Sequence, residues 1–284
     1  MTKILVTGGA GFVGSHLCER LQGQGHTVVS LDNYSTGFKD NHVEGVEYVE
    51  GDTKNILKCG LPNDFQLIYH LGEYSRVEQS YQDLDMVLDY NLYSLNPVLS
   101  FASQCKAKLV YSGSSTKFSQ ESSSLSPYAW TKAVNVDFVK NYAKWYGLDY
   151  AITYFYNVYG KREISDGKYS TVVAKFLKIK SDGGTTLPVT LPGTQRRNFT
   201  HVDDIVDALI LIGMHCKGDG YGIGSPESFS ILELAEMIGL TPDMKPEVKG
   251  NRTDAPVLSD KTIELGWKAQ RNLKEYINTC LKHI

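Results

Sequence analysis

The first half of the chain alternates short apolar runs, rich in β-branched residues, with longer stretches whose apolar positions recur every three or four residues. Such alternation is typical of strands separated by helices, and it predicts a parallel sheet covered by helices on both faces. We therefore expect an α/β fold with a doubly wound parallel sheet. The first helix is expected at 14–22, and the strands at 3–7, 27–31, 46–50, 67–70, 108–112 and 151–155.

The second half of the chain is less regular, because prolines interrupt its apolar runs. Helices are expected there at 202–214 and 231–238. This contrast predicts two domains with a soft boundary near Gly160: a larger one at 1–160 and a smaller α+β portion at 161–284. Segments around 198–216 are expected to pack back on the first domain.

Composition excludes several classes of protein. The 284 residues include 29 Lys+Arg and 32 Asp+Glu without a basic run, which argues against a nucleic-acid surface. No apolar stretch approaches the roughly 20 residues that span a bilayer, and the N-terminus does not resemble a signal peptide. Five scattered cysteines indicate a reducing compartment, and seven histidines show no ligand spacing. We expect a cytoplasmic protein without metal, membrane or nucleic-acid partners.

Glycines are concentrated between the first expected strand and the first expected helix. Gly8 is followed by Gly9, Gly11 and Gly14, and this spacing permits a tight turn with a pyrophosphate close to the backbone at the helix N-terminus. Asp32 ends the second strand, where a carboxylate can accept bonds from both adenosine ribose hydroxyls and repel a 2′-phosphate. The pattern predicts a Rossmann-type site for NAD rather than NADP, with a purely structural turn as the alternative.

Tyr128 and Lys132 form a second candidate site. They lie four residues apart on an expected helix that begins at Ser126 and Pro127, so they share one face. An ammonium beside a phenol favours the phenolate, so the tyrosine could act as a base near neutral pH. The spacing also occurs on helices without any function. A hydroxyl-rich segment at 112–116 nevertheless follows another strand, at the sheet edge where α/β proteins bind ligands.

With these motifs, the chain resembles the extended short-chain dehydrogenase/reductase family, specifically its nucleotide-sugar epimerases and dehydratases. The resemblance implies NAD bound at 1–160, a nucleotide sugar bound at 161–284, and a homodimer formed through the helix at 128–146, whose apolar residues lie on more than one side. The matching segments are 7–14, 31–33, 51–52, 70–80, 111–116, 128–132, 156–160, 197–204 and 265–267.

The resemblance also assigns cofactor contacts. Tyr128 would be the catalytic base, and Lys132 would bind the nicotinamide ribose and tune the tyrosine. Asp52 would bind the adenine amino group, and Asn33 the adenosine ribose. The implied cofactor-binding residues are Gly8, Gly11, Phe12, Val13, Gly14, Asp32, Asn33, Asp52, Thr53, Leu71, Gly72, Tyr128 and Lys132.

Substrate contacts follow from the same resemblance. Ser114 would be catalytic by bonding the reacting sugar hydroxyl, while Arg197 and Arg252 would clamp the diphosphate with bidentate guanidinium groups. Val257 falls where epimerases gate the space around carbon 2, and a valine there would admit an N-acetyl group. The implied substrate-binding residues are Glu73, Ser114, Ser115, Tyr128, Asn157, Arg197, Arg252 and Val257.

The residues after Ser114 bear on the reaction. In the 4,6-dehydratases an Asp-Glu pair follows the catalytic hydroxyl, whereas Ser115 and Thr116 follow it here, and neither hydroxyl is an adequate acid or base at neutral pH. The sequence therefore predicts a 4-epimerase acting on a UDP-hexose or a UDP-N-acetylhexosamine. A 4-dehydrogenase or an atypical dehydratase is the alternative within the family, and a non-catalytic NAD sensor is the alternative from another class.

Glu73 departs from the family pattern, which usually has Ala or Gly at this position beside the cofactor. A carboxylate there could stabilise the oxidised nicotinamide, or it could act as a base in an unusual elimination. A simple ion pair with Arg76 on the same loop is the structural alternative.

Overall fold

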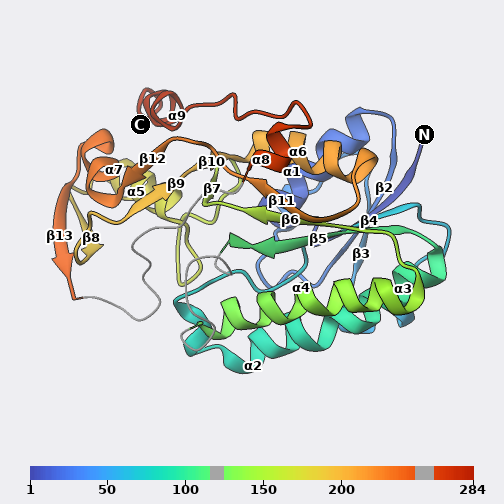
Figure 1. The fold of residues 1–284 in the computed structure, drawn as a ribbon. Helices are drawn as coiled ribbons and strands as arrows, with labels where there is room; N and C mark the ends of the chain where they lie inside the picture. The colour runs from blue at the N-terminus through green and yellow to red at the C-terminus, as the bar shows by residue number, and fades with distance from the viewer. Residues whose placement is uncertain (116–124, 247–258) are drawn as a thin grey trace.

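The computed structural model describes residues 1–115, 125–246 and 259–284 (Figure 1). Two expected substrate-binding residues, Arg252 and Val257, lie outside these residues, as does Thr116. The strands of the central layer are β1 (Lys3–Thr7), β2 (Thr27–Asp32), β3 (Glu47–Glu50), β4 (Leu67–His70), β5 (Lys108–Ser114), β6 (Tyr150–Phe155) and β11 (Gly218–Ile223).

Within the described residues these seven strands form one sheet in the order β11-β6-β5-β4-β1-β2-β3, and every neighbouring pair is parallel. The principal helices are α1 (Phe12–Gly23), α3 (Ser94–Cys105), α4 (Pro127–Tyr146), α5 (Val172–Ser181), α6 (Val202–His215), α7 (Ile231–Ile238) and α9 (Leu273–Leu281). The expected Rossmann-type α/β fold is confirmed. Among the helices that the structure describes, none is long and apolar enough to cross a bilayer.

Shorter elements connect these layers or flank them. The short helices are α2 (Leu84–Val87), α8 (Asp260–Ile263), η1 (Lys39–Asn41), η2 (Thr53–Lys58), η3 (Gln79–Tyr81) and the π-helical turn η4 (Leu88–Tyr93). The remaining strands are β7 (Val158–Tyr159), β8 (Thr186–Thr190), β9 (Arg196–Asn198), β10 (Thr200–His201), β12 (Ser228–Ser230) and β13 (Thr241–Lys245).

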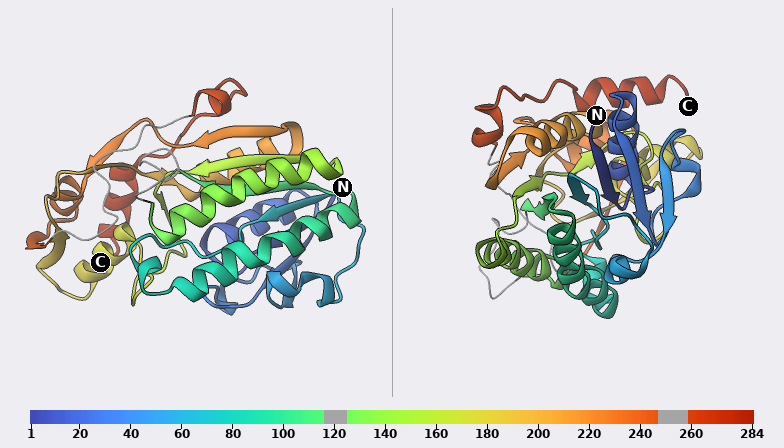
Figure 2. Two further views of the ribbon diagram at one scale, coloured as in Figure 1. Left: turned by 60° about the horizontal axis from the view of Figure 1, so that its bottom comes forward. Right: turned by 90° about the vertical axis from the view of Figure 1, so that its right-hand side faces the viewer.

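Successive side chains of a strand point to opposite faces of the sheet, and in β1 the side chains on both faces are apolar. A layer of helices therefore covers each face. On β1, Leu5 belongs to the apolar cluster that includes Val136 of α4, whereas Ile4 and Val6 belong to the cluster that includes Leu209 of α6. Helices α3 and α4 lie side by side on one face (Figure 2), and α1 packs with α6 on the other. Both faces of the sheet are therefore buried, which explains the continuous apolar runs of its strands.

Strand β11 was not predicted from the sequence. It contains Gly218, Gly220 and Gly222, and its pairing with β6 shifts register between Gly218 and Tyr221. Glycines weaken a strand and remove the side chains that would reveal it, so no apolar alternation marks this segment. β11 therefore belongs to the central sheet although it follows Gly160 in the chain, and α6, which also follows Gly160, packs against that sheet.

A separate apolar cluster holds the smaller α+β portion together. Phe176 of α5, Leu187 of β8, Leu234 of α7 and Ile277 of α9 are all buried in it. The two-stranded pairs β13-β8 and β12-β9 lie in this portion. It lies beyond the carboxyl ends of β5 and β6 (Figure 1).

Helix α4 begins as the sequence predicts. The Oγ atom of Ser126 accepts a hydrogen bond of 3.2 Å from the backbone N–H of Ala129, and Pro127 occupies the first turn. One face of the helix is buried against the sheet, while Trp130 and Trp145 on the outer face are 43% and 62% exposed. In the single chain, α4 is therefore buried on one side only.

Candidate active site

A cavity of about 1150 Å³ lies at the carboxyl ends of the central strands. Its lining includes Asp32 at the end of β2, Leu71 after β4, Ser114 at the end of β5 and Phe155 at the end of β6. Open α/β sheets bind ligands at this edge, because the loops that follow parallel strands converge there.

Nearly all the predicted site residues that the structure describes line this cavity. The exception is Asp52, which lies between two lining residues and caps η2: its Oδ1 atom accepts a bond of 3.0 Å from the N–H of Lys54, and its Oδ2 atom lies 3.4 Å from Nδ2 of Asn33. The predicted residues in the lining are Gly8, Gly11, Phe12, Val13, Gly14, Asp32, Asn33, Thr53, Leu71, Gly72, Glu73, Ser114, Ser115, Tyr128, Lys132, Asn157 and Arg197.

The glycine loop leaves space for an anion at the start of α1. Gly8 has a φ of +74°, and a Cβ atom on Gly14 would lie 2.0 Å from the carbonyl oxygen of Gly8. The N-cap residue is Gly11, so no side chain satisfies the first N–H groups of α1, and its first turn contains no acidic residue. Free N–H groups and the positive end of the helix dipole suit a pyrophosphate.

Asp32 ties this loop to the end of β2. Its Oδ2 atom accepts a bond of 2.9 Å from the N–H of Ala10, and its Oδ1 atom accepts one of 2.8 Å from the N–H of Tyr34. Burial raises the pKa of Asp32, and the two backbone hydrogen bonds oppose that shift. The carboxylate is thus held in the cavity lining at the end of β2, and these residues fit NAD.

We expect Asp32→Ala to reduce the preference for NAD over NADP by at least tenfold, because the repulsion between the carboxylate and a 2′-phosphate is lost. Isothermal titration calorimetry gives both dissociation constants. Asp64→Ala, which removes an exposed carboxylate paired with Lys3, serves as the control. An unchanged ratio in Asp32→Ala would place Asp32 outside the cofactor site.

Tyr128, Lys132 and Ser114 also line the cavity, where α4 and the carboxyl end of β5 border it. Tyr128 is 9% exposed, and its ring packs in a small apolar cluster with Tyr74 and Val87. Lys132 lies one turn further along α4 and donates a bond of 2.6 Å to the carbonyl oxygen of Ser112. Ser114 ends β5 and is also buried. The fold therefore brings together the three residues that the sequence selected as catalytic.

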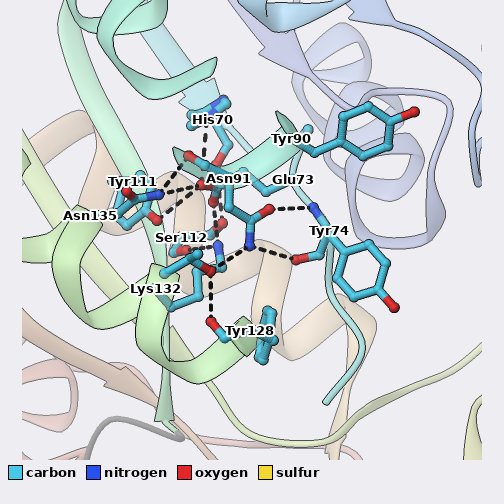
Figure 3. A network of polar contacts seen from close by, with 12 residues as sticks. His70, Glu73, Tyr74, Tyr90, Asn91, Tyr111, Ser112, Tyr128, Lys132 and Asn135 are labelled. Atoms are coloured by element: carbon cyan, nitrogen blue, oxygen red, sulfur yellow. Dashed lines mark hydrogen bonds and ion pairs between the residues drawn. The ribbon is translucent and has the colours of Figure 1, made fainter. Parts of the chain in front are cut away.

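Glu73 lies beside Lys132, and both of its carboxylate oxygens are engaged (Figure 3). One carboxylate oxygen accepts bonds from the hydroxyl of Tyr111 at 3.1 Å and from Nδ2 of Asn135 at 3.0 Å, and the other forms an ion pair with Lys132. The side chains of Glu73 and Lys132 are only 2% and 5% exposed. The carboxylate therefore points between β5 and α4.

The alternative pairing of Glu73 with Arg76 is wrong. Nε of Arg76 donates a bond of 2.9 Å to the carbonyl oxygen of Tyr169, and its Nη1 atom donates to Ser75. The carboxylate of Glu73 instead pairs with Lys132 and accepts hydrogen bonds from Tyr111 and Asn135. These bonds compensate for the burial of its charge.

His70 completes the group beneath the cavity. Its Nδ1 atom lies 2.7 Å from Oγ1 of Thr7, and its Nε2 atom lies 3.9 Å from the carboxylate of Glu73. Burial lowers the pKa of His70 to about 4, despite the opposing effect of Glu73, so the imidazole is neutral at physiological pH. Burial likewise raises the pKa of Tyr111 well above its usual value, so its phenol is also neutral.

Two asparagines of this network were missed in the sequence. Asn135 follows Lys132 by three residues, so helical spacing places both on one face and could have identified it. Asn91 lies in the π-helical turn η4, where its side chain bonds both backbone polar groups of Tyr74 and the hydroxyl of Thr131. No sequence signal marks that turn, so Asn91 could not have been found in this way.

Asn157, which follows β6, and Arg197 on β9 also line the cavity. Asn157 has a φ of +24°, a conformation that asparagine tolerates better than most residues, and its Nδ2 atom donates a bond of 3.1 Å to the carbonyl oxygen of Asn198. This bond links the segment after β6 to β9, which carries Arg197. The two predicted nucleotide-sugar contacts are thereby placed near each other.

Known proteins resemble this chain in sequence and in fold. Residues 4–224 match the NAD dependent epimerase/dehydratase family. The chain is 30% identical to UDP-glucuronic acid decarboxylase 6 of Arabidopsis thaliana over 307 residues, which cover 96% of this chain and 86% of that protein.

Two solved structures have the same fold over nearly their whole length. The UDP-glucose 4-epimerase of Thermus thermophilus in complex with NAD has a TM-score of 0.87 at 26% identity, covering 99% of this chain and 98% of that one. The dTDP-glucose 4,6-dehydratase of Streptomyces venezuelae with NAD bound has a TM-score of 0.88 at 25% identity, covering 99% and 96%. With its glycine loop, Asp32 and the Tyr128–Lys132 pair in one cavity, the chain belongs to the NAD dependent epimerase/dehydratase family of enzymes, and its cofactor is NAD.

Proposed function

We propose that the enzyme interconverts the two C4 epimers of a nucleotide sugar, a UDP-hexose or a UDP-N-acetylhexosamine, through a 4-keto intermediate. The observation that carries this proposal is the convergence of Ser114, Tyr128 and Lys132 at one end of the cavity. Ser115 and Thr116 directly follow Ser114, so these two positions offer no carboxylate for a second proton transfer at carbons 5 and 6.

In this proposal each side chain of the site has a separate role. Tyr128 takes the proton from the 4-hydroxyl of the sugar and later returns it, and Ser114 bonds the oxygen at carbon 4 as its charge changes. Lys132 holds the nicotinamide ribose and lies one helical turn from Tyr128. When bound, NAD accepts hydride from carbon 4 and gives it back to the opposite face after the keto sugar turns over. Arg197 holds the diphosphate through that turn.

Elimination of water would require a further acid or base that reaches the sugar. Glu73 is not available for this role, because its carboxylate is 2% exposed and already bonded by Lys132, Tyr111 and Asn135. This engagement argues against an atypical dehydratase that uses Glu73. It leaves redox chemistry at carbon 4 as the reaction that the site supports best.

A decarboxylase acting on a UDP-uronic acid is a second candidate, favoured by Arg76. This arginine lines the cavity, and within the described chain it bonds only carbonyl and hydroxyl oxygens and forms no ion pair. Burial lowers the pKa of its guanidinium, and nearby tyrosines and the carboxylate of Glu163 oppose that shift. A carboxylate on the sugar would satisfy that charge, and oxidation at carbon 4 would turn the sugar into a β-keto acid, which readily loses carbon dioxide.

Incubation with UDP-glucose, UDP-N-acetylglucosamine and UDP-glucuronic acid, without added NAD, distinguishes these reactions by proton NMR of the products. The proposal predicts the C4 epimer of one of the first two sugars. Loss of water, a pentose product or accumulation of a free ketone would contradict it. Tyr128→Phe protein, purified in the same way, controls for contaminating activities.

We expect Arg197→Ala to raise the apparent dissociation constant of the sugar nucleotide about tenfold or more, because a charge-assisted bond to phosphate contributes ~1.5–3 kcal/mol. Arg196→Ala is the matched control, since the side chain of Arg196 is engaged by Ser228 and Glu233. Steady-state kinetics separates KM from kcat. If the variant changes thermal stability alone, Arg197 is structural.

We also propose a homodimer formed through the outer face of α4. The support is a group of large exposed side chains, namely Trp130, Trp145 and Tyr146 on α4 and Tyr93 on η4. Sedimentation velocity of the purified protein distinguishes a dimer from a monomer, and a monomer at micromolar concentration would contradict the proposal.

A further inference from the structure

The buried ion pair of Lys132 and Glu73 sets this site apart from one that contains a lysine alone (Figure 3). Both oxygens of Glu73 are occupied, and the ammonium of Lys132 also bonds the carbonyl oxygen of Ser112. A carboxylate held by Tyr111 of β5 and by Asn135 and Lys132 of α4 has little freedom to move. Its charge therefore stays beside that of the lysine.

The groups that face this pair are neutral. His70 faces it from β4 and Tyr111 from β5, and both are uncharged at neutral pH because burial shifts their pKa values away from that range. Asn135 faces it from α4 and carries no charge. The positive charge of Lys132 is thus compensated within the group, and the described side chains around the pair add no net charge.

The order of the strands places the pair relative to the cofactor. Asp32 ends β2 and the glycine loop follows β1, so the adenosine and pyrophosphate positions lie over that side of the sheet. Next to β1 lie β4 and then β5, and Glu73 and Lys132 lie by their carboxyl ends. Leu71 and Gly72, which line the cavity, directly precede Glu73. The pair therefore lies at the end of the cavity that would receive the nicotinamide.

We propose that Glu73 is a positioning residue that holds Lys132 and cancels its charge at the nicotinamide end, so that the protein favours NAD⁺ over NADH. The oxidised nicotinamide ring carries a positive charge, and the reduced ring carries none. An uncompensated ammonium nearby would disfavour the oxidised form, whereas an adjacent carboxylate removes that penalty.

This preference has a consequence for catalysis, which rests on the proposed function. Oxidation of the sugar moves a hydride with two electrons from carbon 4 to NAD⁺, forms NADH and passes the hydroxyl proton to Tyr128. A site that favours NAD⁺ drives the reverse transfer, in which NADH returns the hydride to the ketone and Tyr128 returns the proton. The keto intermediate is therefore short-lived and is rarely released.

Glu73→Gln tests the binding preference directly. Glutamine retains an oxygen that accepts bonds from Tyr111 and Asn135, but it removes the charge. Dissociation constants of NAD⁺ and NADH are measured by calorimetry on cofactor-free protein, with no sugar present. The ratio of the NAD⁺ constant to the NADH constant is expected to rise about tenfold, which for this two-electron couple equals about 30 mV in the potential of the bound cofactor. A ratio within twofold of the parent would overturn the proposal.

Asp204→Asn is the matched control for loss of a buried carboxylate. Asp204 is 1% exposed, pairs with Arg271 and does not line the cavity. Its substitution should lower thermal stability but leave the ratio unchanged, and a similar shift in the ratio would show that general loosening is the cause. If Glu73→Gln does not fold, Glu73→Ala is measured in its place. It should also raise the ratio of the NAD⁺ constant to the NADH constant, and an unchanged ratio would overturn the proposal. Because no sugar is used, a failed epimerase assay and a failed cofactor ratio are independent results.

Discussion

Tyr128→Phe is expected to lower kcat by about 10²- to 10⁴-fold while the affinity for NAD stays within a few-fold of the parent. The substitution removes only the hydroxyl that transfers the proton. The ring remains packed with Tyr74 and Val87, so the helix and the cavity keep their shape. Product formation is followed by NMR, and calorimetry gives the dissociation constant of NAD.

Tyr74→Phe provides the control for this substitution. It removes a hydroxyl from the same apolar cluster, and that hydroxyl bonds Asp83 at 2.9 Å on the side away from the predicted chemistry. We expect kcat to stay within a few-fold of the parent. If Tyr128→Phe also retained most of its turnover, Tyr128 would not be the base, and the proton would have to pass to another group.

Gly14→Ala is expected to weaken NAD binding by at least about 100-fold, because a Cβ atom there would lie 2.0 Å from the carbonyl oxygen of Gly8. Relief of that clash must open the turn between β1 and α1, and the N–H groups would then no longer converge on a pyrophosphate. Calorimetry with NAD measures the loss, and thermal unfolding of the cofactor-free protein reports any general destabilisation.

Gly23→Ala is the control in the same helix. Gly23 is the last residue of α1, and a Cβ atom there would have no atom within 4 Å. Alanine should leave NAD affinity unchanged and stabilise the helix by up to ~1 kcal/mol. Parent-like affinity in Gly14→Ala would mean that the turn does not need to approach the cofactor closely.

The first half of the fold could be predicted because most of its strands, unlike the edge strand β3, are buried on both faces and read as apolar runs. The start of α4 was also predictable, since Ser126 and Pro127 act through local geometry alone. Strand β11 could not be predicted, because it is rich in glycine and is held in the sheet by its pairing with β6. Tertiary pairing, rather than local propensity, decides the structure of such a segment.

Some residues of the site could be predicted from the sequence, and others could not. Gly8, Gly14 and Asp32 could be located in advance because each is required by a turn or by the end of a strand. The surroundings of Glu73 could not, because its partners Tyr111 and Asn135 are 38 and 62 residues away in the chain. Asp52 was placed near the cofactor, but its carboxylate caps η2 instead of lining the cavity.

Hydride leaves carbon 4 and returns to the same carbon in the proposed reaction. A UDP-hexose labelled with deuterium at carbon 4 tests this step when it is incubated with the enzyme in ordinary water, and the reaction is then repeated with unlabelled sugar in heavy water. We expect the epimer to keep its deuterium at carbon 4 in the first case and to gain none at carbons 4, 5 and 6 in the second. Loss of the label from carbon 4, or solvent deuterium at carbon 5 or 6, would contradict epimerisation by internal hydride return.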